Sequence, residues 1–153
     1  MNYLDQCLKE VDIHGTLSFS GITLDSELYY RLCKKWVTIG KPAGLSFMLC
    51  DFRLPSEHFR ELLRRIHCQR LVIELSRFEQ FHLDDLILEA MPECEELVVN
   101  CISPMYCPGI TDRTLHRWAI QERPPRKIFL NDIQADFTVD GITTLINVRL
   151  FVE

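Results

Sequence analysis

The sequence has no long apolar run, little glycine or proline, and no excess of positive charge. A membrane-spanning helix needs about 20 apolar residues, and no run in this chain approaches that length. Only 6 of the 153 residues are glycine and 7 are proline, which excludes collagen-like and low-complexity classes. The 17 Lys and Arg against 22 Asp and Glu give a net charge of −5, so the basic surface typical of nucleic-acid-binding proteins is not expected.

Sequence motifs that mark common active sites and metal sites are also missing. No G-x-S-x-G, G-x-x-x-x-G-K-[ST], H-E-x-x-H or G-x-G-x-x-G pattern is found. The 7 cysteines include no C-x-x-C pair, and Cys94, Cys101 and Cys107 do not have the spacing of a zinc site. We therefore expect no catalytic residues, no metal and no cofactor. The first residues lack the basic start and apolar stretch of a signal peptide, so we expect reduced cysteines and a cytoplasmic or nuclear location.

Short apolar triplets recur along the chain at a nearly constant step. They have apolar residues at alternate positions, as β-strands do, and they begin at positions 17, 45, 71, 97, 128 and 150. Steps of 28, 26, 26, 31 and 22 residues are typical of a repeat protein. Helical patterns lie between them, such as the stripe formed by Phe59, Leu62 and Ile66. We expect about five strand–helix repeats over residues 15–153, preceded by an N-terminal cap at residues 1–14.

Connections of this length require parallel strands joined by right-handed crossovers. Two α/β architectures satisfy this requirement. A doubly wound domain has helices on both faces of its sheet, whereas a short leucine-rich-repeat-like solenoid has a parallel sheet with helices on one face. Roughly half of the residues between the alternate apolar positions are polar, which is too many for a sheet buried on both faces. The pattern therefore favours the solenoid.

The same alternation predicts which side chains are buried. In the first three strands, the residues expected to point toward the helices are Leu17, Phe19, Leu45, Phe47, Leu49, Leu71, Ile73 and Leu75. Cys101 is in phase with Leu49 and Leu75, so we expect it to be a small buried core residue. Thr111 and Thr138 are expected to cap the helices that follow them.

The stretch Met91–Leu115, MPECEELVVNCISPMYCPGITDRTL, resembles the cysteine-containing leucine-rich repeat. In that repeat a Cys-x-x-Leu-x-x-Leu-like segment precedes a strand, a Cys follows, and Ile-Thr-Asp begins a helix. The residues at the matching places are Cys94, Leu97, Val99, Cys101, Ile110, Thr111, Asp112 and Leu115. Such repeats belong to F-box proteins, and the irregular repeats also look like the F-box-associated domains of nematode F-box families.

The resemblance implies the target-recognition part of an F-box-like ubiquitin ligase adaptor, in which a Skp-like adaptor is a partner. Residues 1–40 lack the leucine-proline opening and helical core pattern of an F-box. A contact with a Skp-like adaptor would therefore use a missing or separate segment.

The open face of a solenoid sheet is a rigid surface with side chains at fixed spacing, which suits a protein partner. We predict a non-catalytic protein–protein interaction module, or scaffold, that binds through this face. The predicted partner-binding residues are Ser18, Ser46, Met48, Val72, Glu74, Val98, Asn100, Phe129 and Asn131. Apolar residues at the centre with polar residues around them match the anatomy of a binding hot spot. A bare strand is also expected at Leu150–Glu153. Either the chain is part of a longer protein, or this edge pairs with a partner or a second copy.

Two alternatives stay open. One is a small doubly wound enzyme with an unrecognised site at the carboxyl ends of its strands. It predicts that Val98 and Phe129 are buried under helices. It also predicts a pocket near Asn100, Asn131 and Asp132.

The other alternative is an RNA-associated scaffold that binds through a basic helix face. The residues that could contact phosphates there are Arg60, Arg64, Arg65 and Arg70. Acids are interleaved with these arginines and the net charge is negative, so a solvated helix face is favoured over nucleic-acid binding.

Overall fold

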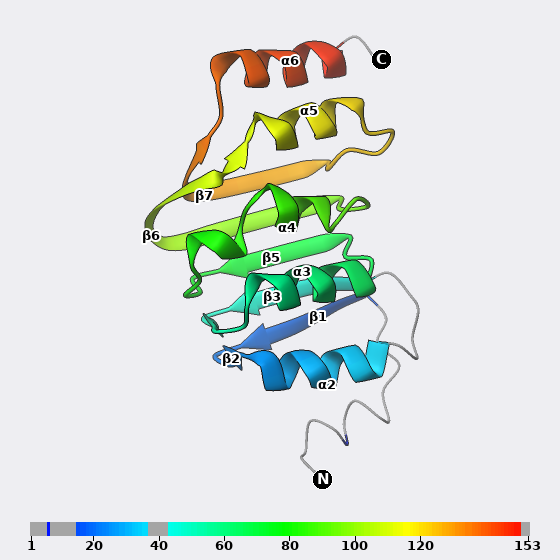
Figure 1. Cartoon of the computed structure of the whole chain (residues 1–153), viewed down its shortest axis with the longest axis vertical. Helices are drawn as coiled ribbons and strands as arrows, with labels where there is room; N and C mark the ends of the chain where they lie inside the picture. The colour runs from blue at the N-terminus through cyan, green and yellow to red at the C-terminus, as the bar shows by residue number, and fades with distance from the viewer. Residues whose placement is uncertain (1–5, 7–14, 37–42, 151–153) are drawn as a thin grey trace.

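Five parallel strands form the sheet in the computed structural model, which describes residues 6, 15–36 and 43–150 (Figure 1). The strands are β1 (Gly15–Ser20), β3 (Ala43–Met48), β5 (Arg70–Glu74), β6 (Glu96–Thr111) and β7 (Lys127–Asp136). They lie in the order β1-β3-β5-β6-β7, and each neighbouring pair is parallel. The first five predicted triplets lie in these strands, so the α/β class and the parallel sheet are confirmed.

A helix follows each strand of the sheet. The helices are α2 (Ser26–Trp36), α3 (Ser56–Arg65), α4 (Asp85–Glu89), α5 (Asp112–Ile120) and α6 (Val139–Leu150). Each packs beside the next one in the chain, and Figure 1 shows them in succession along the long axis. The two-residue strands β2 (Thr23–Leu24) and β4 (Asp51–Phe52) form a separate parallel pair, and the 3-10 helix η1 (Gln80–His82) precedes α4.

The predictions for the two chain ends have different outcomes. The strand expected from position 150 is wrong at its first residue, because Leu150 ends α6. No glycine or proline lies between Gly141 and Leu150, so the sequence contains no residue that would end the helix before Leu150. The rest of this strand, at residues 151–153, lies outside the described residues. The predicted cap at residues 1–14 also lies outside them, apart from Gln6.

Two rows of apolar side chains cross the sheet on the face that the helices cover. The parallel register aligns Leu45, Leu71 and Leu97 in one row, and Phe47, Ile73 and Val99 in the other. All six side chains are at most 1% exposed, and they form one core cluster with the apolar faces of the helices. The prediction that this face is buried is confirmed for these rows, because residues two apart in a strand point to the same side.

A residue with left-handed backbone follows each of the first three strands of the sheet. The φ angle is 65° at Gly21, 55° at Leu49 and 48° at Leu75. The prediction that Leu49 and Leu75 point into the core is wrong, because their side chains are 58% and 44% exposed. A positive φ ends the two-residue alternation of a strand. Cys50 and Ser76, the next residues, are buried instead.

Cys50 and Ser76 make equivalent hydrogen bonds in successive repeats. The Cys50 thiol donates to the carbonyl of Met48 at 3.4 Å, and the Ser76 hydroxyl donates to the carbonyl of Glu74 at 3.0 Å. The Cys50 N–H donates to the Ser76 hydroxyl at 3.0 Å, which joins the two turns. Cys101 directly follows Asn100, so it corresponds in the register to Leu75 and lies one position earlier than Cys50 and Ser76 do in their repeats; it is nevertheless buried as predicted.

Side-chain hydrogen bonds link the N-termini of α4, α5 and α6. The Asp85 carboxylate accepts from the backbone N–H and the hydroxyl of Thr111 at 2.9 and 2.5 Å. It also accepts from the Thr114 hydroxyl at 2.6 Å. One repeat later, the Asp112 carboxylate accepts from the backbone N–H and the hydroxyl of Thr138. The hydroxyls of Thr111 and Thr138 also cap their own helices, as predicted.

The cysteines of the described residues are buried, free thiols. Burial raises the pKa of Cys68 to about 12 and the pKa of Cys94 to about 11, so both thiols are protonated at neutral pH. This agrees with their predicted role as small core residues. Within residues 15–36 and 43–150, no three His, Cys, Asp or Glu side chains are grouped so that they could hold a metal ion. The helices in this part of the chain lack the length and hydropathy needed to cross a membrane.

Candidate functional site on the second face of the sheet

The second face of the sheet presents three rows of side chains, with one residue from each strand in every row. Parallel pairing places equivalent residues of successive repeats side by side. The first row is Thr16, Gly44, Arg70, Glu96 and Lys127; the middle row is Ser18, Ser46, Val72, Val98 and Phe129; the third row is Ser20, Met48, Glu74, Asn100 and Asn131. All nine predicted partner-binding residues lie in the middle and third rows, so the fold brings them together on one surface.

The first row is held by ion pairs. The Glu96 carboxylate contacts Arg70 Nε and Lys127 Nζ, both at 2.8 Å. The hydrogen bond from Lys127 and the charge of Arg70 lower the pKa of Glu96. A Cβ at Gly44 would lie 2.6 Å from Thr16 Oγ1 and 3.1 Å from the Cβ of Arg70, so a larger residue there would crowd its neighbours in this row. The row therefore forms a charged border along the amino ends of the strands.

The middle row is exposed at its ends and buried at its centre. Ser18 and Phe129 are exposed, and Phe129 keeps 48% of its surface in solvent. The prediction that Val72 and Val98 are exposed is wrong, because they are only 6% and 8% exposed. Both lie in central strands, between the longer side chains of the first and third rows. Val72 and Val98 therefore pack beneath the exposed residues of this face, whereas the Phe129 side chain is available for contact with a partner.

The third row combines one apolar side chain with polar ones. Met48 is 43% exposed, while Glu74 and Asn100 are half-buried. The Asn131 amide donates to Asn100 Oδ1 at 2.9 Å and to Asp132 Oδ2 at 3.0 Å. These bonds fix the orientation of the amides, so the row presents a defined set of donors and acceptors.

Leu49 and Leu75 extend this surface beyond the third row, and the sequence pattern placed them wrongly. Their N–H groups donate to the carbonyls of Glu74 and Asn100 at 3.0 and 2.9 Å, so the backbone pairing continues through the left-handed turn. Their exposed side chains follow Met48 at the carboxyl ends of the strands. The signal that could have found them is the recurrence of Leu before a small residue, Cys50 or Ser76, after 26 residues.

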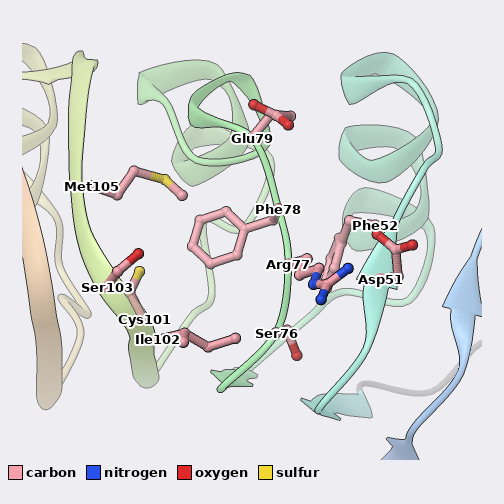
Figure 2. Close-up of a pocket in the computed structure, with 10 residues that line it drawn as sticks. All are labelled: Asp51, Phe52, Ser76, Arg77, Phe78, Glu79, Cys101, Ile102, Ser103 and Met105. Atoms are coloured by element: carbon pink, nitrogen blue, oxygen red, sulfur yellow. The ribbon is translucent and has the colours of Figure 1, made fainter.

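A groove of about 430 Å³ opens where β5 and β6 separate (Figure 2). Their pairing ends at Glu74 and Asn100, and the pairing of β6 with β7 shifts between Asn100 and Met105. The lining residues are Asp51, Phe52, Ser76, Arg77, Phe78, Glu79, Cys101, Ile102, Ser103 and Met105. Figure 2 shows Phe78 on one side and Met105 and Ile102 on the other, pointing toward one another across the groove.

The groove combines apolar walls with charges of both signs. Ile102 is 61% exposed at its rim. Asp51 is paired with Arg53 at 2.8 Å, and Arg77 and Glu79 are exposed beside it. Burial raises the pKa of the Cys101 thiol, so the thiol is protonated at neutral pH and is a poor nucleophile. This lining suits contact with an apolar side chain more than covalent chemistry.

The buried His82 holds the loop that carries Phe78 and Glu79. Its Nε2 donates to the carbonyl of Leu54 at 2.8 Å, and its Nδ1 accepts from the N–H of Glu79 at 3.1 Å. Because Nδ1 needs a lone pair to accept this bond, the ring is neutral, with its proton on Nε2. Burial lowers the pKa of His82 from its ordinary value of 6.5.

We expect His82 to make the protein less stable in mild acid. Because the pKa of His82 is lower in the folded chain than in the unfolded chain, the unfolded chain takes up the proton first. The contribution of the neutral His82 ring to the free energy of unfolding is complete above about pH 6.5. It is lost as the pH falls toward the folded-state pKa of His82. The urea midpoint, measured at a series of pH values, should therefore decrease in this range, and the decrease should be smaller in His82→Gln. The exposed His116 provides the control: His116→Gln should keep the full decrease, and an equal decrease in His82→Gln would contradict the assignment.

The structure differs from what the enzyme alternative predicts. Phe129 is exposed rather than buried under helices, and Val98 is buried in the middle row but lies outside the core cluster. The three residues near which a pocket was predicted, Asn100, Asn131 and Asp132, do not line the groove. The order of the described strands also lacks the reversal that creates a site in a doubly wound sheet.

Three of the four arginines of the RNA alternative are paired with acids. Arg64 and Arg65 contact Glu61 at 2.9 and 2.8 Å. The hydrogen bond from Arg65 lowers the pKa of Glu61, so its negative charge is kept at neutral pH. Arg70 contacts Glu96 in the first row. This pairing reduces the positive charge available for phosphates.

Comparisons of this chain with protein-family models, with curated proteins and with solved structures find no match.

Proposed function

We propose that the chain is a short leucine-rich-repeat-like solenoid and that it binds a protein partner through the second face of its sheet, without catalysing a reaction. The observation that carries the proposal is the register, which gathers nine residues from five strands into two adjacent rows. Such a surface forms only when equivalent positions of successive repeats are aligned.

The strand order supports the one-sided arrangement of the helices. Each described crossover leads to the next strand in the same direction across the sheet. Right-handed crossovers that always step in one direction place their helices on the same face. Among the described residues, no helix then covers the second face, which agrees with the exposure of Met48 and Phe129.

The surface favours a partner with an apolar anchor surrounded by polar groups. Phe129 and Met48 are large exposed apolar side chains, and Leu49 and Leu75 add two more at the carboxyl ends of the strands. Asn131 and other polar residues of the same rows lie around them. This combination is typical of binding hot spots.

The resemblance to cysteine-containing repeats extends the proposal to a biological role. We place the chain in the target-recognition part of an F-box-like adaptor, in the cytoplasm or nucleus, where its buried thiols would stay reduced. A Skp-like adaptor would then bind through a separate segment or subunit and would be recovered together with the target.

Phe129→Asp tests the proposed surface. A partner captured from native extract by the wild-type chain, identified by cross-linking and mass spectrometry and then purified, should bind this variant about thirtyfold more weakly. The thermal midpoint should change little, because Phe129 is half-exposed. Ile120→Asp is the control, since Ile120 is 84% exposed at the end of α5 and away from the second face.

Two results would contradict the proposal. One is equal binding by the wild type and Phe129→Asp, and the other is unfolding of Phe129→Asp, which would place Phe129 in the core. Recovery of a Skp-like adaptor with the target would support the ligase role. Its absence from every complex that contains the target would refute that role alone.

A further inference from the structure

The middle of β6 stands apart from both neighbouring strands. The pairing of β6 with β5 ends at Asn100, and its pairing with β7 skips from Asn100 to Met105. The side chains of residues 102–104, between these points, are all exposed, whereas the side chains of a regular strand alternate between the two faces of its sheet. Residues 102–104 therefore form an exposed segment, which has no register partner in β5 or β7 and which we call the β6 bulge.

The β6 bulge contains a serine followed by a proline. Ser103 and Pro104 form the only serine–proline or threonine–proline pair in the 153 residues. The ring of Pro104 disfavours helical backbone at the residue before it, so Ser103 is held in an extended conformation even where strand pairing is lost. The Ser103 hydroxyl is therefore presented to solvent on an extended piece of chain.

The sequence around Ser103 favours one class of protein kinase. Residues 98–109 contain no Asp, Glu, Lys or Arg, so a kinase that recognises acidic or basic side chains beside its target finds none here. Proline-directed kinases instead recognise the proline that follows the target. Proline has no N–H, so the kinase needs no acceptor at this position.

We propose that Ser103 is a phosphorylation site for a proline-directed serine/threonine kinase that uses ATP. A bond forms between Ser103 Oγ and the γ-phosphorus of ATP, the bond from this phosphorus to the β–γ bridging oxygen breaks, and ADP leaves. The hydroxyl proton passes to the catalytic aspartate of the kinase. Ser18 is also exposed, but its strand is paired with β3 and Phe19 follows it, so it is not a site of this kind.

Arg77 lies where its charge attracts the added phosphate. Figure 2 shows Ser103 on the β6 side of the groove and Arg77 on the opposite side. Arg77 is exposed, it is the only cation among the residues that line the groove, and no ion pair within the described residues includes it. A phosphoserine carries about −1.5 to −2 charges at neutral pH and pairs strongly with a guanidinium group. Phosphorylation is therefore expected to draw the two walls of the groove together.

Phosphorylation of the folded 153-residue chain tests the site. Incubation with ATP and a purified proline-directed kinase should add one phosphate, which mass spectrometry should locate at Ser103. Ser103→Ala should take up none, and Pro104→Ala should react about tenfold more slowly. Both changes lie in an exposed segment, so the circular dichroism spectrum should not change. No incorporation into the wild type, or equal incorporation into Ser103→Ala, would overturn the proposal.

Leu63→Ala shows whether the kinase acts on the folded chain. Leu63 is fully buried in α3, so its truncation should raise the unfolded fraction about a hundredfold. A kinase that binds the β6 bulge of the folded chain should phosphorylate this variant and the wild type at the same rate. A rate that rises with the unfolded fraction would show that Ser103 is reached only after unfolding, and the proposal would then be wrong.

The titration of the phosphate tests the contact with Arg77. The second pKa of a phosphoserine is ordinarily about 6. Phosphorus NMR should give a lower pKa in the phosphorylated wild type, and a value about 0.5 higher in phosphorylated Arg77→Gln. Arg123→Gln is the control, since Arg123 is exposed in the loop before β7, and it should keep the wild-type pKa. An equal pKa in the wild type and Arg77→Gln would overturn the contact. These tests are independent of the proposed partner surface, because Ser103 and Arg77 are not among its nine residues.

Discussion

Replacing Phe47 with alanine is expected to lower the free energy of unfolding by about 4 kcal/mol. Phe47 is fully buried, and its ring lies 5.5 Å from the ring of Phe19 and 5.1 Å from that of Phe52, between centroids. The truncation would leave a cavity among rings from different repeats. Because a domain of this kind has a total stability of about 5–15 kcal/mol, the loss should be plain in urea unfolding followed by circular dichroism.

Phe129→Ala is the matched control for this prediction. Both residues are phenylalanines in strands of the same parallel sheet, but Phe129 lies on the second face and is 48% exposed. We expect its truncation to change the free energy of unfolding by no more than about 1 kcal/mol. Equal losses for the two variants would show that both faces are packed, and the proposed partner surface would then be wrong.

Replacing Asp85 with alanine is expected to cost about 3 kcal/mol of stability. The Asp85 carboxylate is buried and accepts three hydrogen bonds, two from Thr111 and one from Thr114. Removing it leaves the Thr114 hydroxyl, which is fully buried, without this acceptor. Unpaired buried donors are expensive because water cannot reach them. The urea midpoint should decrease while the slope of the transition stays the same.

Asp112→Ala removes the equivalent link of the next repeat and serves as the control. Its bonds to Thr138 lie in an exposed region, so we expect a much smaller decrease in the urea midpoint. These bonds lower the pKa of Asp112. The contribution of Asp112 to the free energy of unfolding is therefore present above its unfolded-state pKa, and it is lost as the pH falls through its folded-state pKa. A decrease as large as that of Asp85→Ala would contradict the role of burial in the first link.

The alternation of apolar residues predicted much of the candidate surface, and it failed where the backbone left the strand conformation. It identified Phe129 and Met48 correctly as exposed, because both lie inside regular strands. It failed at Leu49 and Leu75, because a positive φ changes the direction of the side chain and alternation within one strand does not reveal that angle. It also failed at Val72 and Val98, since their exposure depends on neighbours in other strands, which a pattern within one strand does not describe.

The groove and the His82 contacts had no signal in the sequence. The groove exists because β6 separates from β5 after Asn100 while it still pairs with β7. His82 is one of five histidines scattered along the chain. Its role depends on Leu54, which is 28 residues away in the sequence and is brought close only by the packing of successive repeats.

The sequence by itself determined the alternation of strands and helices, the spacing of the repeat and the parallel sheet, because these follow from local periodicity and from the length of each connection. Tertiary structure alone decided which side chains at the strand ends face solvent, which residues of the second face are covered, and where the groove opens. Those properties depend on contacts between residues about 26 positions apart, whose distances are set by the stacking of whole repeats and not by the order of amino acids within one of them.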